Sequence, residues 1–137
     1  MILSVDPGGT CGLAMWQADG TFVNKLKLSL DSFVLWASDV DIELSVIVYE
    51  DYTLRGHQAY AQRGSKLEAS QGIGIVKMLA ARKNAKLVRQ QASILKITAM
   101  HAEVPVVTHF DDDVSAYLHG YYYFEQQGLL KTKLQSR

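Results

Sequence analysis

Two short apolar runs, each ending in an acidic residue, constrain the fold of this chain more than any other feature. The first is ILSVD at residues 2 to 6, and the second is SVIVYE at residues 45 to 50. Near-continuous runs of apolar and β-branched residues are typical of strands that are covered on both faces. We therefore expect both runs to be central strands of a sheet that is flanked by helices.

Weaker signals predict the other elements of the chain. Residues 12 to 17, 21 to 28 and 85 to 90 are further strand candidates, with a turn at residues 18 to 20. Asp31-Ser32 offers the N-cap of a helix that extends to about Ala37. Residues 66 to 83 predict a long helix, and two more helices are expected at residues 92 to 100 and from about 112 to 125. Successive turns of this long helix are expected to carry Leu67, Ser70, Ile73 or Gly74, and Lys77 or Met78.

The order of these elements defines the expected architecture. Three strands, a helix, a strand, a helix, a strand and two helices predict an α/β fold with a mixed five-stranded sheet. The first three strands form an antiparallel meander, and the later strands add in parallel. The chain contains no repeat, low-complexity tract or linker, so residues 1–137 are expected to form one domain.

Composition excludes several classes of protein. A hydrophobic fraction of 48% and a charged fraction of 20% are typical of a globular chain. Cys11 is the only cysteine, which rules out an internal disulfide and a multi-cysteine zinc site. No apolar run reaches the roughly 18 residues of a membrane span. The start of the chain lacks signal-peptide features, so a cytoplasmic location without a membrane partner is expected.

Acidic residues stand at the ends of three predicted elements. Asp6 and Glu50 end the two central strands, and the segment HFDDD at residues 109 to 113 begins the last helix. Carboxyl ends of parallel strands meet at one edge of a sheet, where sites of α/β proteins gather. Several carboxylates that converge need a cation to neutralise them. We therefore predict a site for Mg²⁺ or Mn²⁺, with two metals per site acting on a phosphodiester.

Each of these acids also has a simpler interpretation. Asp6 precedes Pro-Gly-Gly, which is a common turn sequence. Glu50 can lie at a solvated strand end, and residues 111 to 113 can serve only as a helix N-cap. Their order along the chain and their placement at element ends favour the metal site.

Four segments together resemble the RuvC-type Holliday junction resolvases of the RNase H-like (retroviral integrase) superfamily. These segments are SVDPGGTCGLAMW, VIVYEDY, KLEASQGIGIV and HFDDDVSAYLHGYYYF, and they follow one another in the family order. The compact chain is most similar to the RuvC-related resolvases of bacteriophages. The resemblance implies an RNase H-like fold and a homodimer that cuts four-way and other branched DNA junctions.

The resemblance also implies roles for individual residues. Asp6 and Glu50 match metal ligands of the family. The last motif is His-x-x-Asp or Asp-x-x-Asp in the family, so His109 with Asp112 is the favoured assignment. Asp113 remains an alternative ligand, because Ala116 follows it by one turn. His109 has either a metal-shell or acid/base role, or a simple surface position.

Basic and aromatic residues follow the second acidic motif. Overall charge is balanced, with 14 Lys plus Arg and 14 Asp plus Glu, so a nucleic-acid surface requires local clustering. The family places the segment after the second acid near the centre of the junction. This implies a set of DNA-contacting candidates: Tyr52, Arg55, His57, Tyr60, Arg63 and Lys66.

Three other functions compete with a junction resolvase. The DPGGT motif is also similar to the phosphate loop of the sugar kinase and actin superfamily, but that scheme needs two such domains and leaves the late acidic helix without a role. We therefore expect no organic cofactor. A YqgF-like nuclease acting on RNA is a second alternative. A non-catalytic nucleic-acid-binding module with an RNase H fold is the third, although an inactive relative would be expected to have lost acidic residues.

Overall fold

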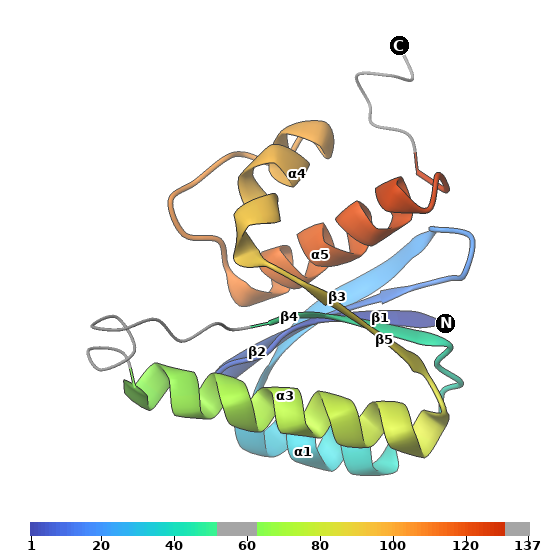
Figure 1. The fold of residues 1–137 in the computed structure, drawn as a ribbon, viewed down its shortest axis with the longest axis vertical. Helices are drawn as coiled ribbons and strands as arrows, with labels where there is room; N and C mark the ends of the chain where they lie inside the picture. Colours follow the sequence, from blue (N-terminus) through green and yellow to red (C-terminus); the bar gives the residue numbers. More distant parts are fainter. Residues whose placement is uncertain (52–62, 131–137) are drawn as a thin grey trace.

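The computed structural model of the protein describes residues 1–51 and 63–130. In this structure a five-stranded sheet lies between two layers of helices (Figure 1). The strands are β1 (Ile2–Asp6), β2 (Thr10–Trp16), β3 (Phe22–Ser29), β4 (Val46–Glu50) and β5 (Lys86–Gln90). Their order across the sheet is β3-β2-β1-β4-β5. β1, β2 and β3 pair antiparallel, whereas β4 and β5 add in parallel, so the predicted mixed sheet is confirmed.

Helices cover both faces of this sheet (Figure 1). One layer holds α1 (Leu30–Asp39) and α3 (Arg63–Lys83). The other holds α4 (Leu95–His101), which follows a 3₁₀ turn, η1 (Ala92–Ile94), and α5 (Asp112–Gln126). Within the two described ranges, no helix has the length and apolar character needed to cross a membrane.

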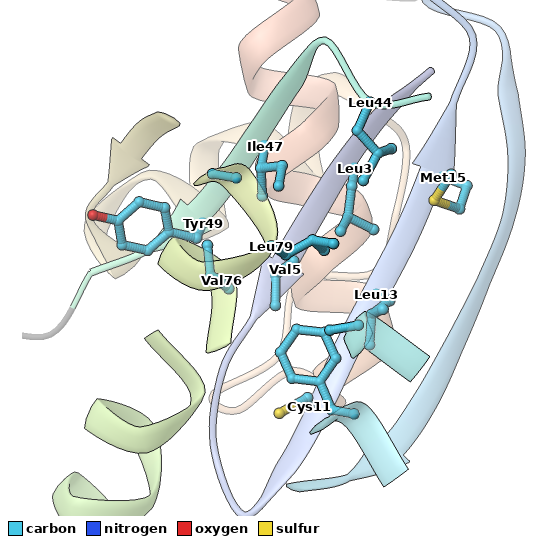
Figure 2. Packing of buried hydrophobic residues seen from close by; sticks show 13 residues of the cluster. Leu3, Val5, Cys11, Leu13, Met15, Leu44, Ile47, Tyr49, Val76 and Leu79 are labelled. Carbon is cyan, nitrogen blue, oxygen red and sulfur yellow. The ribbon is translucent and has the colours of Figure 1, made fainter. Parts of the chain in front are cut away.

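Each layer has its own hydrophobic core. Alternate residues of β1 point to opposite faces, so Leu3 and Val5 pack toward α1 and α3, while Ile2 packs toward α4 and α5. Figure 2 shows the first of these cores, where Val76 and Leu79 of α3 meet the apolar side chains of the strands. Trp16, Leu118 and Phe124 are among the buried residues of the second core.

The N-cap predicted for the first helix was wrong. The N-cap of α1 is Ser29, whose hydroxyl accepts a hydrogen bond from the Ser32 amide at 3.1 Å, instead of Asp31-Ser32. Ser29 is therefore both the last residue of β3 and the N-cap of α1, and the helix starts earlier than the sequence pattern indicated.

The buried face of α3 is not the face on which the large residues of the predicted succession lie. Ala69, Val76 and Leu79 are buried, whereas Leu67 is 64% exposed and Met78 is 40% exposed. Gly72 is part of the true face, because a Cβ there would come within 2.7 Å of the Pro7 side chain. Packing against the sheet, rather than the spacing of large apolar residues, determines which face of this helix is buried.

Candidate active site

Asp6 and Glu50 are neighbours because β1 and β4 are parallel. Val5 of β1 is in register with Tyr49 of β4, so the next residue on each strand is an acid. Ser4 faces α5, because its hydroxyl donates a hydrogen bond to the Ala116 carbonyl of that helix at 2.6 Å. Asp6 follows Ser4 by two residues, and Glu50 follows Val48, the register partner of Ser4, by two residues, so both acids face α5 as well. The convergence predicted for these two acids is therefore seen.

Asp112 reaches the same place because α5 begins directly over the sheet. Gly12 of β2 is the register partner of Asp6, and a Cβ on Gly12 would overlap the Asp112 carbonyl. Gly120 allows a similar close approach further along α5, where a Cβ would come within 2.3 Å of the Trp16 indole nitrogen. The N-terminus of α5 thus lies beside Asp6.

Two cavities meet at these acids. One has a volume of about 230 Å³ and the other about 440 Å³. Four residues line both cavities: Asp6, Glu50, His109 and Asp112. The smaller cavity is also lined by Lys96 and Ser115, and the larger by the Pro7-Gly8-Gly9 turn and Glu68.

The site has an unfavourable concentration of negative charge. Burial, followed by the charges of Glu50 and Asp112, raises the pKa of Asp6 to about 8, against a smaller opposing effect of the nearby Ser115 hydroxyl. Burial also raises the pKa of Asp112, and the positive charges of Lys27 and His109 partly offset this. A bound cation would relieve the repulsion among these carboxylates.

Ser115 adds a further oxygen to this group. It is 2% exposed and follows Asp112 by one helical turn. Its Oγ lies near the Asp6 carboxyl and opposes the rise in the pKa of that group, but within the described part of the chain no contact of this hydroxyl has the full geometry of a hydrogen bond. The hydroxyl lines the smaller cavity.

The oxygen atoms at this site are of the chemical type that binds a hard divalent cation. Asp6, Glu50 and Asp112 supply carboxylate oxygens, and Ser115 supplies a hydroxyl, which are ligands that Mg²⁺ and Mn²⁺ prefer. Within residues 1–51 and 63–130, the present side-chain conformations bring no three His, Cys, Asp or Glu residues into a group that could hold a metal. Side-chain rotation would therefore have to accompany binding.

Asp113 lies apart from the other acids. Its carboxylate contacts Lys25 of β3 at 2.9 Å and accepts a hydrogen bond from the Val114 amide at 2.9 Å. Burial tends to raise the pKa of Asp113, but these two partners bring it below its usual value. Asp113 lines neither cavity, whereas its alternative, Asp112, lines both.

The predicted DNA-contacting residues fall largely outside the described part of the chain. Tyr52, Arg55, His57 and Tyr60 lie outside the described residues. Arg63 and Lys66 belong to the first turn of α3, but the positions of their side chains are not among those described.

Sequence reasoning missed several residues around the site. Ser115 and His119 follow Asp112 at helical spacings of three and seven, and that periodicity is a signal that could have identified them. Glu68 was quoted only as part of the segment KLEASQGIGIV. Its place opposite Gly9, whose Cβ would overlap the Glu68 carboxylate, depends on tertiary packing.

The sheet order and the helix layers match the RNase H-like fold of RuvC. One solved structure to which this chain is similar is that of RuvC from Thermus thermophilus. Its structure in complex with a Holliday junction substrate is 9% identical over 95% of this chain and 97% of that chain, with a TM-score of 0.66. A second structure, of T. thermophilus RuvC, is 10% identical over 95% and 98%, with a TM-score of 0.59. No protein-family model and no curated protein sequence matches the chain.

Proposed function

We propose that this protein is a metal-dependent endonuclease that resolves four-way (Holliday) and other branched DNA junctions by phosphodiester hydrolysis. The observation that carries the proposal is the meeting of Asp6, Glu50 and Asp112 at one pair of cavities, although they come from β1, β4 and α5. The RuvC-type fold supports it, because one protein with this fold is described in complex with a Holliday junction substrate. We assign residues 1–137 to one nuclease domain that acts in the cytoplasm, or in the host cytoplasm if a phage encodes it.

The metal ligands in this proposal are Asp6, Glu50 and Asp112, with two Mg²⁺ or Mn²⁺ ions per site. When bound, the two ions supply the positive charge that activates a water and stabilises the leaving oxygen. Asp6 lies near both Glu50 and Asp112 and would hold the metal together with them. Gly8 and Gly9 line the larger cavity without side chains, which leaves room for a phosphate to approach.

His109 has an acid/base role in this proposal. It lines both cavities from the loop before α5, and its positive charge acts on Asp112. A histidine at this place can transfer a proton at a phosphodiester near neutral pH. Asp113 is assigned a structural role, because Lys25 already contacts its carboxylate.

DNA contacts would surround this site. Lys96 lines the smaller cavity, and the set predicted from sequence at residues 52 to 66 directly follows Glu50 in the chain. Phosphate contacts from lysine and arginine supply most of the affinity of proteins for DNA. In this proposal Tyr60 stacks on an opened base at the junction.

A second copy of the chain is the proposed partner, because a four-way junction offers two opposed strands to be cut. Exposed apolar side chains gather on α1 and α3, where Leu35 is 71% exposed and Leu67 is 64% exposed. A groove of about 440 Å³ between these helices is lined mainly by apolar residues, including Val34, Ile75 and Met78. Figure 1 shows α1 and α3 on the opposite side of the sheet from α5, so a dimer formed through these two helices would leave both sites accessible.

The test is a cleavage assay on a labelled synthetic four-way junction, beside linear duplex, single-stranded DNA and a structured RNA. Paired symmetric nicks that require Mg²⁺ or Mn²⁺ and that EDTA abolishes are the expected result. Cleavage of the RNA alone would replace this proposal with an RNA nuclease. Metal-independent binding with no cleavage of any substrate would make the protein a nucleic-acid-binding module.

A further inference from the structure

His119 is a fully buried polar residue at the back of the candidate active site. It lies on α5, two turns after Asp112, and has no exposed surface. Its Nε2 is 2.9 Å from Oε1 of Glu50, and its Nδ1 is 2.8 Å from Oε1 of Gln90. The imidazole therefore joins the ends of β4 and β5 to the middle of α5.

The partners of the ring determine which atom donates to Glu50. An ionised carboxylate only accepts hydrogen bonds, so Nε2 must carry the proton in the contact with Glu50. The carboxamide of Gln90 can accept from Nδ1 or, in its other orientation, donate to it. In either orientation Nε2 remains the donor to Glu50.

This hydrogen bond acts on one oxygen of Glu50 only. Glu50 lines both cavities, and its side chain keeps 14% of its surface exposed, so the carboxylate is held at its back and open at its front. Asp6 lies beside it on the neighbouring strand, where Val5 is in register with Tyr49. The hydrogen bond from His119 holds the Glu50 carboxylate in this orientation, and without a fixed donor that restraint is lost.

We propose that His119 is a positioning residue, which holds the Glu50 carboxylate toward the cavity so that its free oxygen can bind a divalent cation. The inference rests on the proposed metal-dependent function. Hydrogen bonds to the ligands of a metal site orient those ligands, and their loss typically costs about 10- to 100-fold in metal affinity or activity. Gln90 is the second member of this arrangement, because it fixes the ring from the other side.

Two substitutions separate positioning from packing. His119→Leu removes the donor but keeps an apolar side chain of similar reach. His119→Gln keeps an amide N–H that can donate to Glu50. The matched control is His101→Leu, because His101 forms a second histidine–glutamate pair with Glu125 of α5 at 3.0 Å, and neither residue lines a cavity at the acids.

The measurement is the affinity of Mn²⁺ for each purified protein, by titration calorimetry without DNA, beside thermal unfolding in EDTA. We expect His119→Leu to weaken Mn²⁺ binding by about 10- to 100-fold. His119→Gln should recover most of that loss, and His101→Leu should bind as the wild type does even if it unfolds earlier. The Mg²⁺ concentration needed for half-maximal junction cleavage should rise in the same order.

Unchanged Mn²⁺ affinity in a folded His119→Leu protein would overturn the inference, and so would equal losses in the Leu and Gln variants. If His119→Leu does not fold, Gln90→Leu, which removes the support of the ring from the other side, takes its place: weaker Mn²⁺ binding is expected, and an unchanged affinity would overturn the inference. Wild-type protein that binds Mn²⁺ but cuts no nucleic acid would refute the proposed function while the calorimetry still tests His119. Wild-type protein that binds no Mn²⁺ would refute both.

Discussion

The carbonyl of Asp112 lies over Gly12, in the space that a side chain at residue 12 would fill. Gly12 is also the register partner of Asp6, so this contact brings the start of α5 beside the end of β1. Glycine weakens the interior of a strand, and its use there often marks a close approach of another backbone. A residue without a side chain thus controls how near Asp112 comes to Asp6.

We predict that Gly12→Ala displaces the N-terminus of α5 and weakens the site. The added methyl group meets backbone atoms, which cannot rotate away, so unfolding should become easier by about 1–3 kcal/mol. Mn²⁺ affinity should fall as well, because Asp112 moves. Urea unfolding and calorimetry on the same preparation measure both effects.

Gly74→Ala is the control for this substitution. A Cβ at Gly74 meets nothing within 4 Å, and the residue lies within α3. Alanine should therefore leave Mn²⁺ affinity unchanged and stabilise the helix by up to about 1 kcal/mol. A Gly12→Ala protein that matches Gly74→Ala in both measurements would show that α5 does not depend on the contact.

We predict that Asp6→Asn retains the fold and loses cleavage. Asparagine has nearly the shape of aspartate but removes the charge that burial, Glu50 and Asp112 make unfavourable. In EDTA the variant should therefore unfold at the wild-type temperature or above it. Junction binding should persist or strengthen, because a negative charge near the phosphates is gone.

Thermal unfolding with and without metal tests the same substitution independently of DNA. A ligand that binds only the folded state raises its stability by RT ln(1 + [L]/Kd). Millimolar Mg²⁺ or Mn²⁺ should raise the wild-type Tm and leave the Asp6→Asn Tm almost unchanged. An equal rise in both proteins would place the metal elsewhere.

We predict opposite results for the two adjacent acids of α5. Asp112→Asn should abolish cleavage, because Asp112 lines both cavities. Asp113→Asn should leave cleavage nearly intact and cost at most about 1 kcal/mol, since it breaks a partly exposed pair with Lys25. Nicking rates and urea unfolding of the two variants show which aspartate is the ligand, and Lys25→Gln is the matching substitution of the partner of Asp113. Slower cleavage by Asp113→Asn than by Asp112→Asn would make Asp113 the ligand.

The strands, the mixed character of the sheet and the position of two acids at strand ends were predictable from local patterns. Continuous apolar runs with β-branched residues indicated β1 and β4, and an acid at the end of each run gave the edge of the sheet where the acids meet. This worked because the period of a strand and the burial of a central strand are both visible in a few residues.

Features that depend on packing between distant elements were not predictable in the same way. Leu67 and Met78 have the spacing of a core stripe, yet the small residues Ala69 and Gly72 face the sheet, because α3 lies close to Pro7. In the sequence, His119 is a single polar residue within an aromatic helix, and nothing nearby indicates its partners. Its role depends on Glu50 and Gln90, which are 69 and 29 residues away.

The edge strand β3 leads to the last prediction, because its lysines lie on the face of the sheet that carries α5. Lys27 is in register with Gly12, and Lys25 with Ala14, so both residues stand beside the first turn of α5. Lys25 is already paired with Asp113, whereas Lys27 is exposed and its charge acts on Asp112.

We predict that Lys27 contacts a backbone phosphate of DNA that enters the site. In an Asp6→Asn background, Lys27→Gln should weaken junction binding at low salt and reduce the slope of log K against log salt by about one. Lys86→Gln, at the opposite end of the parallel strands, should change neither quantity. Gel-shift titrations at four salt concentrations measure the junction affinity and the slope of log K against log salt. Equal slopes for the two variants would show that Lys27 does not contact the DNA.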